Sequence, residues 1–463
     1  MRLAQSRVHF IGIGGIGMCG LAELLHNMGV YVQGSDMSEN ANSLRLKELG
    51  IQVYIGHHAR QVENIDVCVY SSAVKKDNVE YANARRLGIP LIPRAEALAE
   101  IMRLKRGIGI AGSHGKTTTT SMTAAILLAC ETDPTIVVGG RLDLIKSTAK
   151  LGSGDWIVAE ADESDGSFNR LSPEIVVITN IDNDHLDHYK TFENLQNAFY
   201  EFASRIPFYG LAIVCGDDLA TKELFHDFPK RILFYGFEES NDFILRGENS
   251  NYEIFYSEAG KLDATKWGEF KLAVPGRHNA LNAMAAILAA RESGLHKDDT
   301  FLGLQTFNGV DRRLQKRLDE NGYIYYDDYG HHPTEIRAVL QALREKIANK
   351  NETDKKIKVL FQPHRYSRTQ LCWNDFKTCF DLADELYMLD IYPAGEAPIA
   401  GVTTEKLIAE MKHKNAAFVK SKSEAVEKIV ASLKPQDVFL TLGAGDVYKT
   451  GDEIFRAIKE KNQ

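Results

Sequence analysis

The chain has few cysteines and no long apolar run, and both absences exclude whole classes of protein. Its six cysteines in 463 residues are scattered at positions 19, 68, 130, 215, 372 and 379, without a CxxC pair. This scatter argues against a disulfide or zinc framework and for a reducing compartment. Cys19 and Cys130 fall within apolar helical patterns, where we expect buried thiols. No stretch approaches the roughly 20 apolar residues of a membrane span, and the N-terminal apolar run is too short for a signal peptide, so we expect a cytoplasmic protein without membrane insertion.

The chain also lacks an excess of positive charge. Lys and Arg number 55 against 63 Asp and Glu, which gives a formal net charge of −8. Sequence-independent binding to nucleic acid is therefore not expected. Hydrophobic residues make up 44% and charged residues 25%, as in an ordinary soluble globular protein. A chain of this length is too long for one core, so about three domains are expected.

The most informative motif is a glycine-rich loop between an apolar run, 108–111, and a helical pattern, 119–129. The loop residues are Gly112, Ser113, His114, Gly115, Lys116, Thr117 and Thr118. A loop in this position points backbone N–H groups at phosphate oxygens. Lys116 would reach the β- and γ-phosphates, and the Thr117 hydroxyl would hold Mg²⁺. Ile110 stands where the usual phosphate-loop pattern has glycine, so the motif predicts an ATP site of a variant type.

A second glycine turn lies near the N-terminus. Gly12, Gly14 and Gly17 fit G-x-G-x-x-G between an apolar strand, 8–11, and a helical pattern. Asp36 falls about where an acid meets a ribose hydroxyl. Further strands are expected at 31–33, 52–54, 67–70 and 90–92. Together these features predict a Rossmann-like domain of about a hundred residues that binds a nucleotide diphosphate.

Acidic and histidine side chains follow two apolar strands of the next segment. The strand 156–159 ends at Glu160, and the strand 175–178 precedes Asn180 and the Asp184/His185 group. Ligands gather at the carboxyl ends of strands in parallel α/β sheets. Because Mg²⁺ takes oxygen ligands and substrate phosphates, Glu160 beside the phosphate loop predicts a magnesium site.

The last third of the chain contains another series of strands, at 323–326, 358–361, 385–389 and 438–441. Helical patterns separate them, which predicts a second Rossmann-like sheet. Arg365 and Arg368 follow the second of these strands and could together grip a carboxylate, because guanidinium groups pair with carboxylates in bidentate fashion. Upstream, Asn279 and Asn282 are three residues apart and share one face of a helix start.

In this order, the segments resemble the Mur ligases of bacterial cell-wall synthesis. The segments that carry the resemblance are HFIGIGGIGM, AGSHGKTTTT, EADESDGSF, TNIDNDHLDHY, GRHNALNAMAA, DRRLQKR, DDYGHHPTE and FQPHRYSRT. The last two are typical of the family member that adds alanine. The resemblance implies an α/β protein of three domains. They are a Rossmann-like UDP-sugar domain (1–105), a central P-loop ATPase-type domain (106–310) and a Rossmann-like amino-acid domain (311–463).

The resemblance also implies an activity. The expected substrates are ATP, UDP-N-acetylmuramate and L-alanine, with Mg²⁺ as the metal. The expected reaction forms an amide between alanine and the lactyl carboxylate through an acyl phosphate, as a step in peptidoglycan precursor synthesis. We expect a monomer or weak homodimer whose domains close before the chemical step.

The resemblance also assigns individual residues to four kinds of binding site and to a catalytic group. The ATP site would consist of the seven loop residues with Asn180, Asn279, Asn282 and Arg313. The metal would be held by Thr117, Glu160 and His185. The UDP-sugar would meet Gly14, Gly15, Ile16, Gly17, Ser35, Asp36, His57 and Ser71. Alanine would meet His331, His364, Arg365 and Arg368. The catalytic group would consist of Lys116, Glu160, His185 and Asp328.

Three questions stay open at this point. Either His331 or Asp328 could take the proton from the amine. Several relatives carry a carbamylated lysine after the metal histidine, and here Lys190 stands too close to His185 for that role. A nicotinamide-dependent sugar dehydrogenase, an ATP-dependent switch, a ligase for a recycled tripeptide and a folate polyglutamate ligase are the competing functions, and the first two leave part of the motif series unexplained.

Overall fold

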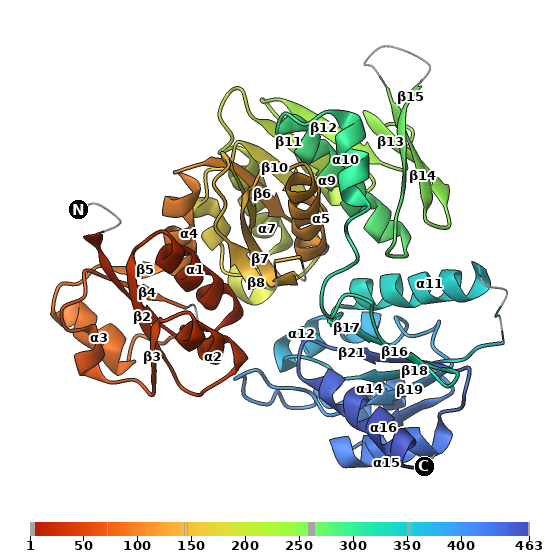
Figure 1. Ribbon diagram of the computed structural model, residues 1–463. Helices are drawn as coiled ribbons and strands as arrows, with labels where there is room; N and C mark the ends of the chain where they lie inside the picture. The colour runs from red at the N-terminus through yellow and green to blue at the C-terminus, as the bar shows by residue number, and fades with distance from the viewer. Residues whose placement is uncertain are drawn as a thin grey trace. The chain divides into compact units, whose positions relative to one another are not determined.

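The strands of the chain form three sheets, and helices connect most of them (Figure 1). The computed structural model describes residues 5–71, 73–142, 144–145, 147–257, 264–349, 352 and 354–461. The chain divides into two compact units. The first contains residues 1–246, 252–271 and 281–310, and the second contains 247–251, 272–280 and 311–463. The predicted α/β class with three sheets is confirmed.

The N-terminal sheet is parallel, with the strand order β3-β2-β1-β4-β5. This is the order that right-handed βαβ crossovers produce on both sides of a first strand. Its elements are β1 (Arg7–Ile11), α1 (Ile16–Asn27), β2 (Tyr31–Asp36), α2 (Ala41–Glu48), β3 (Gln52–Ile55), η2 (Ala59–Val62), β4 (Val67–Tyr70), α3 (Val79–Arg86), β5 (Leu91–Pro93) and α4 (Arg94–Met102). The predicted strand at 31–33 continues to Asp36, because Ser35 still pairs with Ile11 and Asp36 pairs with Ile55.

The central sheet has ten strands in the order β15-β14-β13-β12-β11-β10-β6-β9-β7-β8. Its strands are β6 (Arg106–Ala111), β7 (Thr135–Leu142), β8 (Ser147–Lys150), β9 (Trp156–Glu160), β10 (Ile175–Ile178), β11 (Leu211–Cys215), β12 (Ile232–Gly236), β13 (Phe243–Glu248), β14 (Asn251–Tyr256) and β15 (Thr265–Lys271). Its helices are α5 (Lys116–Ala129), η3 (Ser167–Arg170), α6 (Leu186–Tyr189), α7 (Phe192–Ala203), α8 (Leu219–Phe225), α9 (Arg277–Glu292) and α10 (Lys297–Leu304). Because β9 and β10 lie on either side of β6 in parallel, their carboxyl ends flank the phosphate loop.

The C-terminal sheet has six strands in the order β16-β17-β21-β18-β19-β20. Only its β16–β17 pair is antiparallel. Its strands are β16 (Gln315–Glu320), β17 (Tyr323–Asp328), β18 (Ile357–Phe361), β19 (Glu385–Met388), β20 (Ala416–Phe418) and β21 (Val438–Leu442). Its helices are α11 (Pro333–Asn349), α12 (Tyr366–Leu371), α13 (Trp373–Phe376), α14 (Thr404–Glu410), α15 (Lys422–Ser432) and α16 (Val447–Lys461).

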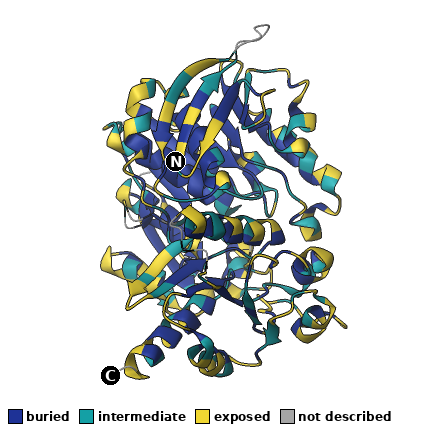
Figure 2. Ribbon diagram, turned by 90° about the vertical axis from the view of Figure 1, so that its right-hand side faces the viewer, coloured by how far each residue is buried: buried dark blue, intermediate teal, exposed yellow. Residues whose placement is uncertain are grey.

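Many helices bury one face and expose the other, whereas α5 is buried continuously from Thr117 to Leu127 (Figure 2). In α16 the buried apolar residues Val447, Ile454, Phe455 and Ile458 recur at helical spacing and pack in one core cluster. Burying such a side chain contributes about 1.5–3 kcal/mol each. The expectation of a buried Cys130 is wrong. It follows the last residue of α5 and is half-buried, while the other five cysteines are buried.

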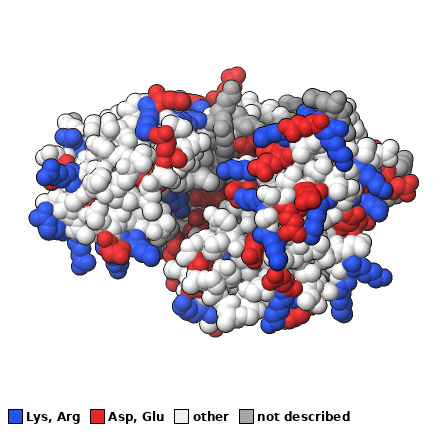
Figure 3. Space-filling model, turned by 90° about the horizontal axis from the view of Figure 1, so that it is seen from below, with Lys and Arg blue, Asp and Glu red and all other residues white. Residues whose placement is uncertain are grey.

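The surface carries both signs of charge. On the face shown in Figure 3, acidic and basic side chains are interspersed rather than gathered into one basic area. Within the described parts of the chain, no helix has the length and apolar character that crossing a membrane requires.

Candidate active site

Two glycines give the phosphate loop its shape. Gly112 has φ +139° and Gly115 has φ +86°, values that favour glycine. A Cβ on Gly112 would collide with the Thr179 hydroxyl, and one on Gly115 would lie 2.5 Å from Asn282 Oδ1. The loop therefore packs directly against residues at the end of β10 and on α9. The predicted ATP-site residue Asn282 does lie beside the loop.

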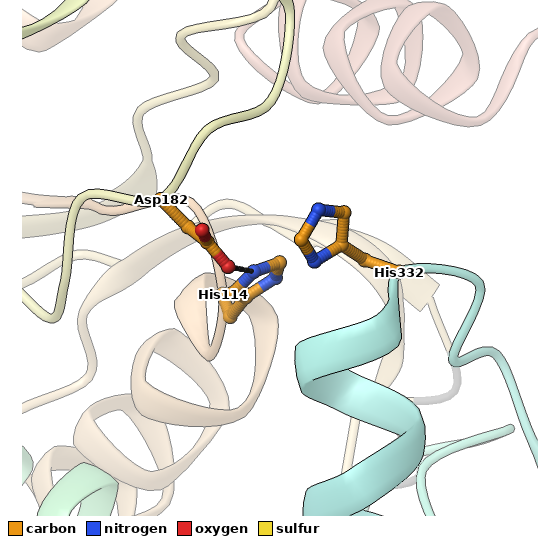
Figure 4. A group of neighbouring side chains, drawn as sticks. All are labelled: His114, Asp182 and His332. Atoms are coloured by element: carbon orange, nitrogen blue, oxygen red, sulfur yellow. Dashed lines mark hydrogen bonds and ion pairs between the residues drawn. The ribbon is translucent and has the colours of Figure 1, made fainter. Parts of the chain in front are cut away.

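Polar contacts fasten the loop to the segment after β10. The His114 backbone N–H donates to Asn180 Oδ1 at 2.9 Å, and Asn180 Nδ2 donates back to the His114 carbonyl at 3.0 Å. His114 Nε2 lies 2.8 Å from Asp182 Oδ2, with the imidazole facing the carboxylate (Figure 4). The Asp182 N–H donates to Ser113 Oγ. These reciprocal bonds fix the loop before any ligand arrives.

Lys116 begins α5 and folds its side chain back over the loop. Its ammonium donates to the Gly112 carbonyl at 2.6 Å, the Ser113 carbonyl at 3.2 Å and Glu163 Oε1 at 2.8 Å. Although burial opposes the charged form, the neighbouring carboxylate of Glu163 helps raise the pKa of Lys116. The lysine is therefore protonated and held beside the backbone of the loop, where a phosphate would bind.

Glu163 lies in the loop after β9, and its side chain is fully buried. Burial raises the pKa of its carboxyl to about 7, and the charge of Lys116 opposes that rise. Its Oε1 also lies 3.6 Å from His185 Nε2. The Tyr189 hydroxyl donates to the Glu163 carbonyl and fixes the backbone there. Glu163 was not predicted as a site residue, although Glu160, three residues before it, was.

Glu160 is the last residue of β9, as predicted. Its Oε2 accepts the N–H of Gly139 at 2.8 Å, and a Cβ on Gly139 would lie 2.5 Å from Glu160 Oε1. A Cβ on Gly140 would come within 3.1 Å of Thr117 Cγ2. The two glycines of β7 thus make room for Glu160 and Thr117. A Gly-Gly pair inside a strand was the available signal for this close approach.

His185 precedes α6 with φ +58°, a left-handed conformation that is uncommon outside glycine. Its backbone N–H donates to Asp184 Oδ1 at 2.8 Å. Its Nε2 lies 3.7 Å from Asp184 Oδ2 as well as near Glu163. The structure therefore brings the predicted metal histidine to the same carboxylate that holds the loop lysine.

In the N-terminal domain, the glycine turn is tied to the end of β2. The Gly14 N–H donates to Asp36 Oδ2 at 2.8 Å, and Asn42 Nδ2 donates to the Gly14 carbonyl at 2.9 Å. Gly15 is the N-cap of α1, and the exposed Ile16 is its first residue. A Cβ on Gly17 would lie 3.1 Å from the Arg94 guanidinium. The predicted acid therefore shapes the turn.

Two further predicted residues of this domain share one buried carboxylate. Glu80 Oε2 accepts the Ser35 hydroxyl at 2.5 Å and lies 3.1 Å from His57 Nδ1. It also lies 3.4 Å from the buried His9. Hydrogen bonds from these groups lower the pKa of Glu80 despite its burial. Ser71, the other predicted residue, donates its N–H to the Ile11 carbonyl at the end of β1.

In the second unit, Asp328 ends β17 and is nearly completely buried. Its Oδ1 accepts the N–H of Gly330 and its Oδ2 accepts the N–H of Leu314, both at 2.6 Å. Burial raises the pKa of Asp328 to about 6, which the charge of Arg313 opposes. This carboxylate therefore holds two backbone segments together.

A second acid, Glu335, organises the histidine loop. Its Oε2 accepts the backbone N–H groups of His331 and His332, at 3.0 and 3.2 Å. Its Oε1 lies 3.5 Å from Arg313 Nη1, and that guanidinium lies 5.3 Å from the centroid of the Tyr329 ring. Sequence reasoning missed Glu335, although an acid in the first turn after Pro333 favours the helix N-terminus.

The predicted alanine residues gather after β18. His364 stacks on Tyr392 with centroids 5.4 Å apart, and its ring centroid lies 6.0 Å from that of His331. Burial, then the charges of Arg368 and Arg365, lower the pKa of His364 to about 4. Arg365 has φ +71°. The result is a neutral imidazole beside two guanidinium groups.

Asn279 is placed differently from its predicted partner Asn282. Its Nδ2 donates to the Pro275 carbonyl at 2.7 Å, and it belongs to the second unit, while Asn282 belongs to the first. Several residues of these sites were absent from the sequence prediction. They are Glu80, Gly139, Gly140, Glu163, Asp182 and Glu335.

Comparisons with known proteins match the chain in three consecutive parts. Residues 7–106 match the Mur ligase family, catalytic domain, and residues 110–290 match the Mur ligase middle domain. Residues 312–445 match the Mur ligase, glutamate ligase domain. The three matches correspond to the three sheets.

Full-length relatives and solved structures agree with these matches. The UDP-N-acetylmuramate–L-alanine ligase of Bdellovibrio bacteriovorus is 59% identical over 99% of this chain and 100% of its own. That of Geotalea daltonii is 46% identical over 98% of each chain. The crystal structure of the corresponding ligase from Thermotoga maritima covers 99% of this chain and 100% of its own, with a TM-score of 0.82 and 29% identity. The chain therefore belongs to the Mur ligase family.

Proposed function

We propose that this chain joins L-alanine to the lactyl carboxylate of UDP-N-acetylmuramate, with ATP converted to ADP and phosphate. The observation that carries the proposal is the 59% identity, over nearly the whole chain, to a relative that bears this activity in its name. The phosphate loop with its buried Lys116–Glu163 pair supports the ATP half of the reaction. The arginine pair after β18 supports the amino-acid half.

The lactyl carboxylate must be activated first, because a carboxylate is a poor electrophile. Transfer of the γ-phosphoryl group to it gives an acyl phosphate, and Lys116 would stabilise the negative charge that spreads over the transferring group. The loop N–H groups at the start of α5 would hold the nucleotide phosphates. Asn180 and Asp182 keep the loop in place for this task.

The residues present also fit a divalent cation. Thr117, Glu160 and His185 offer a hydroxyl, a carboxylate and an imidazole. Glu163 adds a buried carboxylate oxygen that accepts no hydrogen bond within the described parts of the chain. The hydroxyl and carboxylate oxygens of this set are hard donors, which suit Mg²⁺. When bound, Mg²⁺ would supply positive charge to the phosphate and carboxylate oxygens.

The alanine would be held by its carboxylate. Arg365 and Arg368 offer guanidinium forks for it, and their charges help keep the neighbouring His364 neutral. The amine then faces the acyl carbonyl and must lose a proton. His331 fits this role better than Asp328, because both oxygens of Asp328 already accept backbone N–H groups.

The UDP-sugar would bind at the carboxyl end of the N-terminal sheet. The turn from Gly14 to Gly17 opens α1, and a helix N-terminus favours a diphosphate. Ser35 and His57 lie at the ends of β2 and β3 for contacts to the nucleoside. Asp36 supports the turn through Gly14 and so acts on the diphosphate indirectly.

The decisive test is phosphate release with UDP-N-acetylmuramate against a panel of amino acids and the recycled tripeptide. We expect release with L-alanine and Mg²⁺ and none when any substrate is left out. Preference for the tripeptide would reassign the substrate, and release without the sugar nucleotide would favour an ATP-dependent switch. Nicotinamide binding, measured by fluorescence, would favour the dehydrogenase.

We also propose that the protein acts in the cytoplasm as a monomer or weak homodimer. The scattered free cysteines support a reducing compartment. Sedimentation at several protein concentrations tests the assembly, and a concentration-independent higher oligomer would contradict it.

A further inference from the structure

Glu163 is a buried acid that none of the site assignments above uses fully. Its side chain is fully buried, and only one of its two oxygens is accounted for. Oε1 accepts Lys116 Nζ at 2.8 Å and lies 3.6 Å from His185 Nε2. Oε2 is also buried, and it accepts no hydrogen bond from the described residues.

An unsatisfied buried carboxylate oxygen is unfavourable, and native proteins rarely leave one without a reason. A role as counter-charge for Lys116 explains Oε1 but leaves Oε2 without a purpose. Lys116 is moreover held by two loop carbonyls in addition to the acid. The free oxygen therefore points to a second partner that carries positive charge.

The charge balance of the reaction identifies this partner. In the structure, the charge of Lys116 compensates Glu163. A nucleotide phosphate at the loop would take over the lysine as its own counter-ion. The acid would then be left buried and uncompensated, which is strongly unfavourable. A divalent cation beside Glu163 would restore the balance, and a carboxylate oxygen is a ligand that Mg²⁺ takes.

We propose that Glu163, together with His185, is a ligand of the divalent cation that accompanies ATP. The Lys116–Glu163 ion pair is then the nucleotide-free arrangement, which is exchanged when phosphate and cation arrive together. Nucleotide and cation binding are coupled through this one carboxylate. The inference rests on the proposed function only in requiring a nucleotide at the phosphate loop.

The test measures ADP binding by calorimetry with and without Mg²⁺, in the full-length protein. Glu163→Gln keeps the shape of the side chain but removes its charge. The matched control is Asp165→Asn, because Asp165 belongs to the same loop but is exposed, and its carboxylate accepts local bonds from Ser167.

We expect Mg²⁺ to strengthen ADP binding to the wild type and to the control equally. In Glu163→Gln, the increase in ADP affinity caused by Mg²⁺ should be smaller by about tenfold or more, which is the usual scale for a residue that supports a bound metal. Without Mg²⁺ it should bind ADP at least as tightly as the wild type, because Lys116 no longer has a competing anion. Glu163→Asp should recover part of the Mg²⁺ effect.

If Mg²⁺ strengthened ADP binding to Glu163→Gln as much as to the wild type, the proposal would be overturned. So would a variant that changes only the metal-free affinity, because Glu163 would then be a counter-charge alone. If the variant still binds ADP without Mg²⁺, it is folded. If it binds ADP neither with nor without Mg²⁺ while its melting curve is unchanged, the proposal is also contradicted. The assay contains neither the sugar nucleotide nor alanine, so its result is independent of whether alanine is the true substrate.

Discussion

At the scale of single residues, burial alone does not decide what an acid does in this protein. Glu163 and Asp328 are both buried, and burial raises the pKa of each, to about 7 and about 6. Glu163 faces a lysine ammonium, whereas Asp328 accepts two backbone N–H groups. Glu163 is therefore able to exchange its partner when a ligand binds, whereas Asp328 holds two backbone segments of the fold together.

Replacing Arg365 with alanine should mainly raise the KM for alanine. A charge-assisted bond to a carboxylate contributes about 1.5–3 kcal/mol, so we expect a rise of about 10- to 100-fold with a smaller change in kcat. Initial-rate kinetics at saturating ATP and UDP-N-acetylmuramate measures the effect. Arg337→Ala is the matched control, because Arg337 bonds Thr378 on the surface of the same domain. An unchanged alanine dependence in Arg365→Ala would move the amino-acid site elsewhere.

The His364 imidazole should stay neutral well below pH 7. Burial and the two neighbouring arginines lower its pKa from 6.5 to about 4. A base whose pKa is lowered on folding stabilises the fold fully above its unfolded value, and this contribution is lost as the pH falls from 6.5 towards 4. NMR titration of the ring proton, assigned with His364→Gln, checks the midpoint. Removing a positive charge in Arg368→Gln should raise it, and a midpoint near 6.5 in the wild type would contradict the expectation.

At the scale of elements, glycines decide how closely the loop, strands and helices meet. Gly112 and Gly115 let the phosphate loop touch Thr179 and Asn282, and Gly139 admits Glu160 to the edge of β7. The sequence shows the glycines of the loop as a motif, but it does not show which neighbours they admit.

Gly115→Ala should damage the nucleotide site beyond its effect on stability. The left-handed conformation at φ +86° costs a side chain roughly 1–2 kcal/mol, and the new Cβ would press on Asn282. Gly29 is the matched control, since it has φ +81° and open space around its Cβ position. Both alanine variants should melt at lower temperature, but only Gly115→Ala should weaken ADP binding in calorimetry. Equal ADP binding in the two would show that the contact with Asn282 is unimportant.

At the scale of the whole molecule, the N-terminal and central sheets belong to one compact unit. Helix α1 packs against β8 at the edge of the central sheet, where a Cβ on Gly20 would lie 2.6 Å from Thr148 Oγ1. The buried Ser147 hydroxyl donates to Glu23 Oε2 at 2.8 Å across the same contact. A helix glycine and a buried polar bond thus join the two sheets.

Gly20→Val should loosen this contact without unfolding either sheet. The valine would overlap Thr148 and Ala149, and overpacking of this kind costs about 1–3 kcal/mol. Hydrogen–deuterium exchange should rise in α1 and β8 and stay unchanged in the C-terminal sheet. Asn27→Val places the same residue at an exposed position of α1 and controls for the effect of a β-branched side chain on the helix. Unchanged exchange in β8 would mean that the contact does not join the sheets.

Most of the strand positions could be predicted from the sequence, because parallel strands buried on both faces read as short apolar runs. The phosphate loop, Glu160 and the arginine pair could be found for the same reason, since each directly follows such a run. Glu163 could not be chosen from its neighbours, because the sequence of a loop does not show whether an acid in it is solvated or buried. Glu335 lies in the first turn of a helix, and an acid is common there whether or not it belongs to a site. Cys130 was misplaced because helical spacing does not show where the buried face of α5 ends.

By itself, the amino-acid sequence determined the three α/β domains and the positions of the polar residues that follow the ends of the strands. Apolar periodicity and glycine spacing are local properties, and they depend only on residues close together in the chain. The tertiary structure decided which of these polar residues share a partner: Lys116 with Glu163, and Ser35 and His57 with Glu80. Those pairings follow from the order of strands in each sheet and from burial, which bring together charges that lie far apart in the sequence.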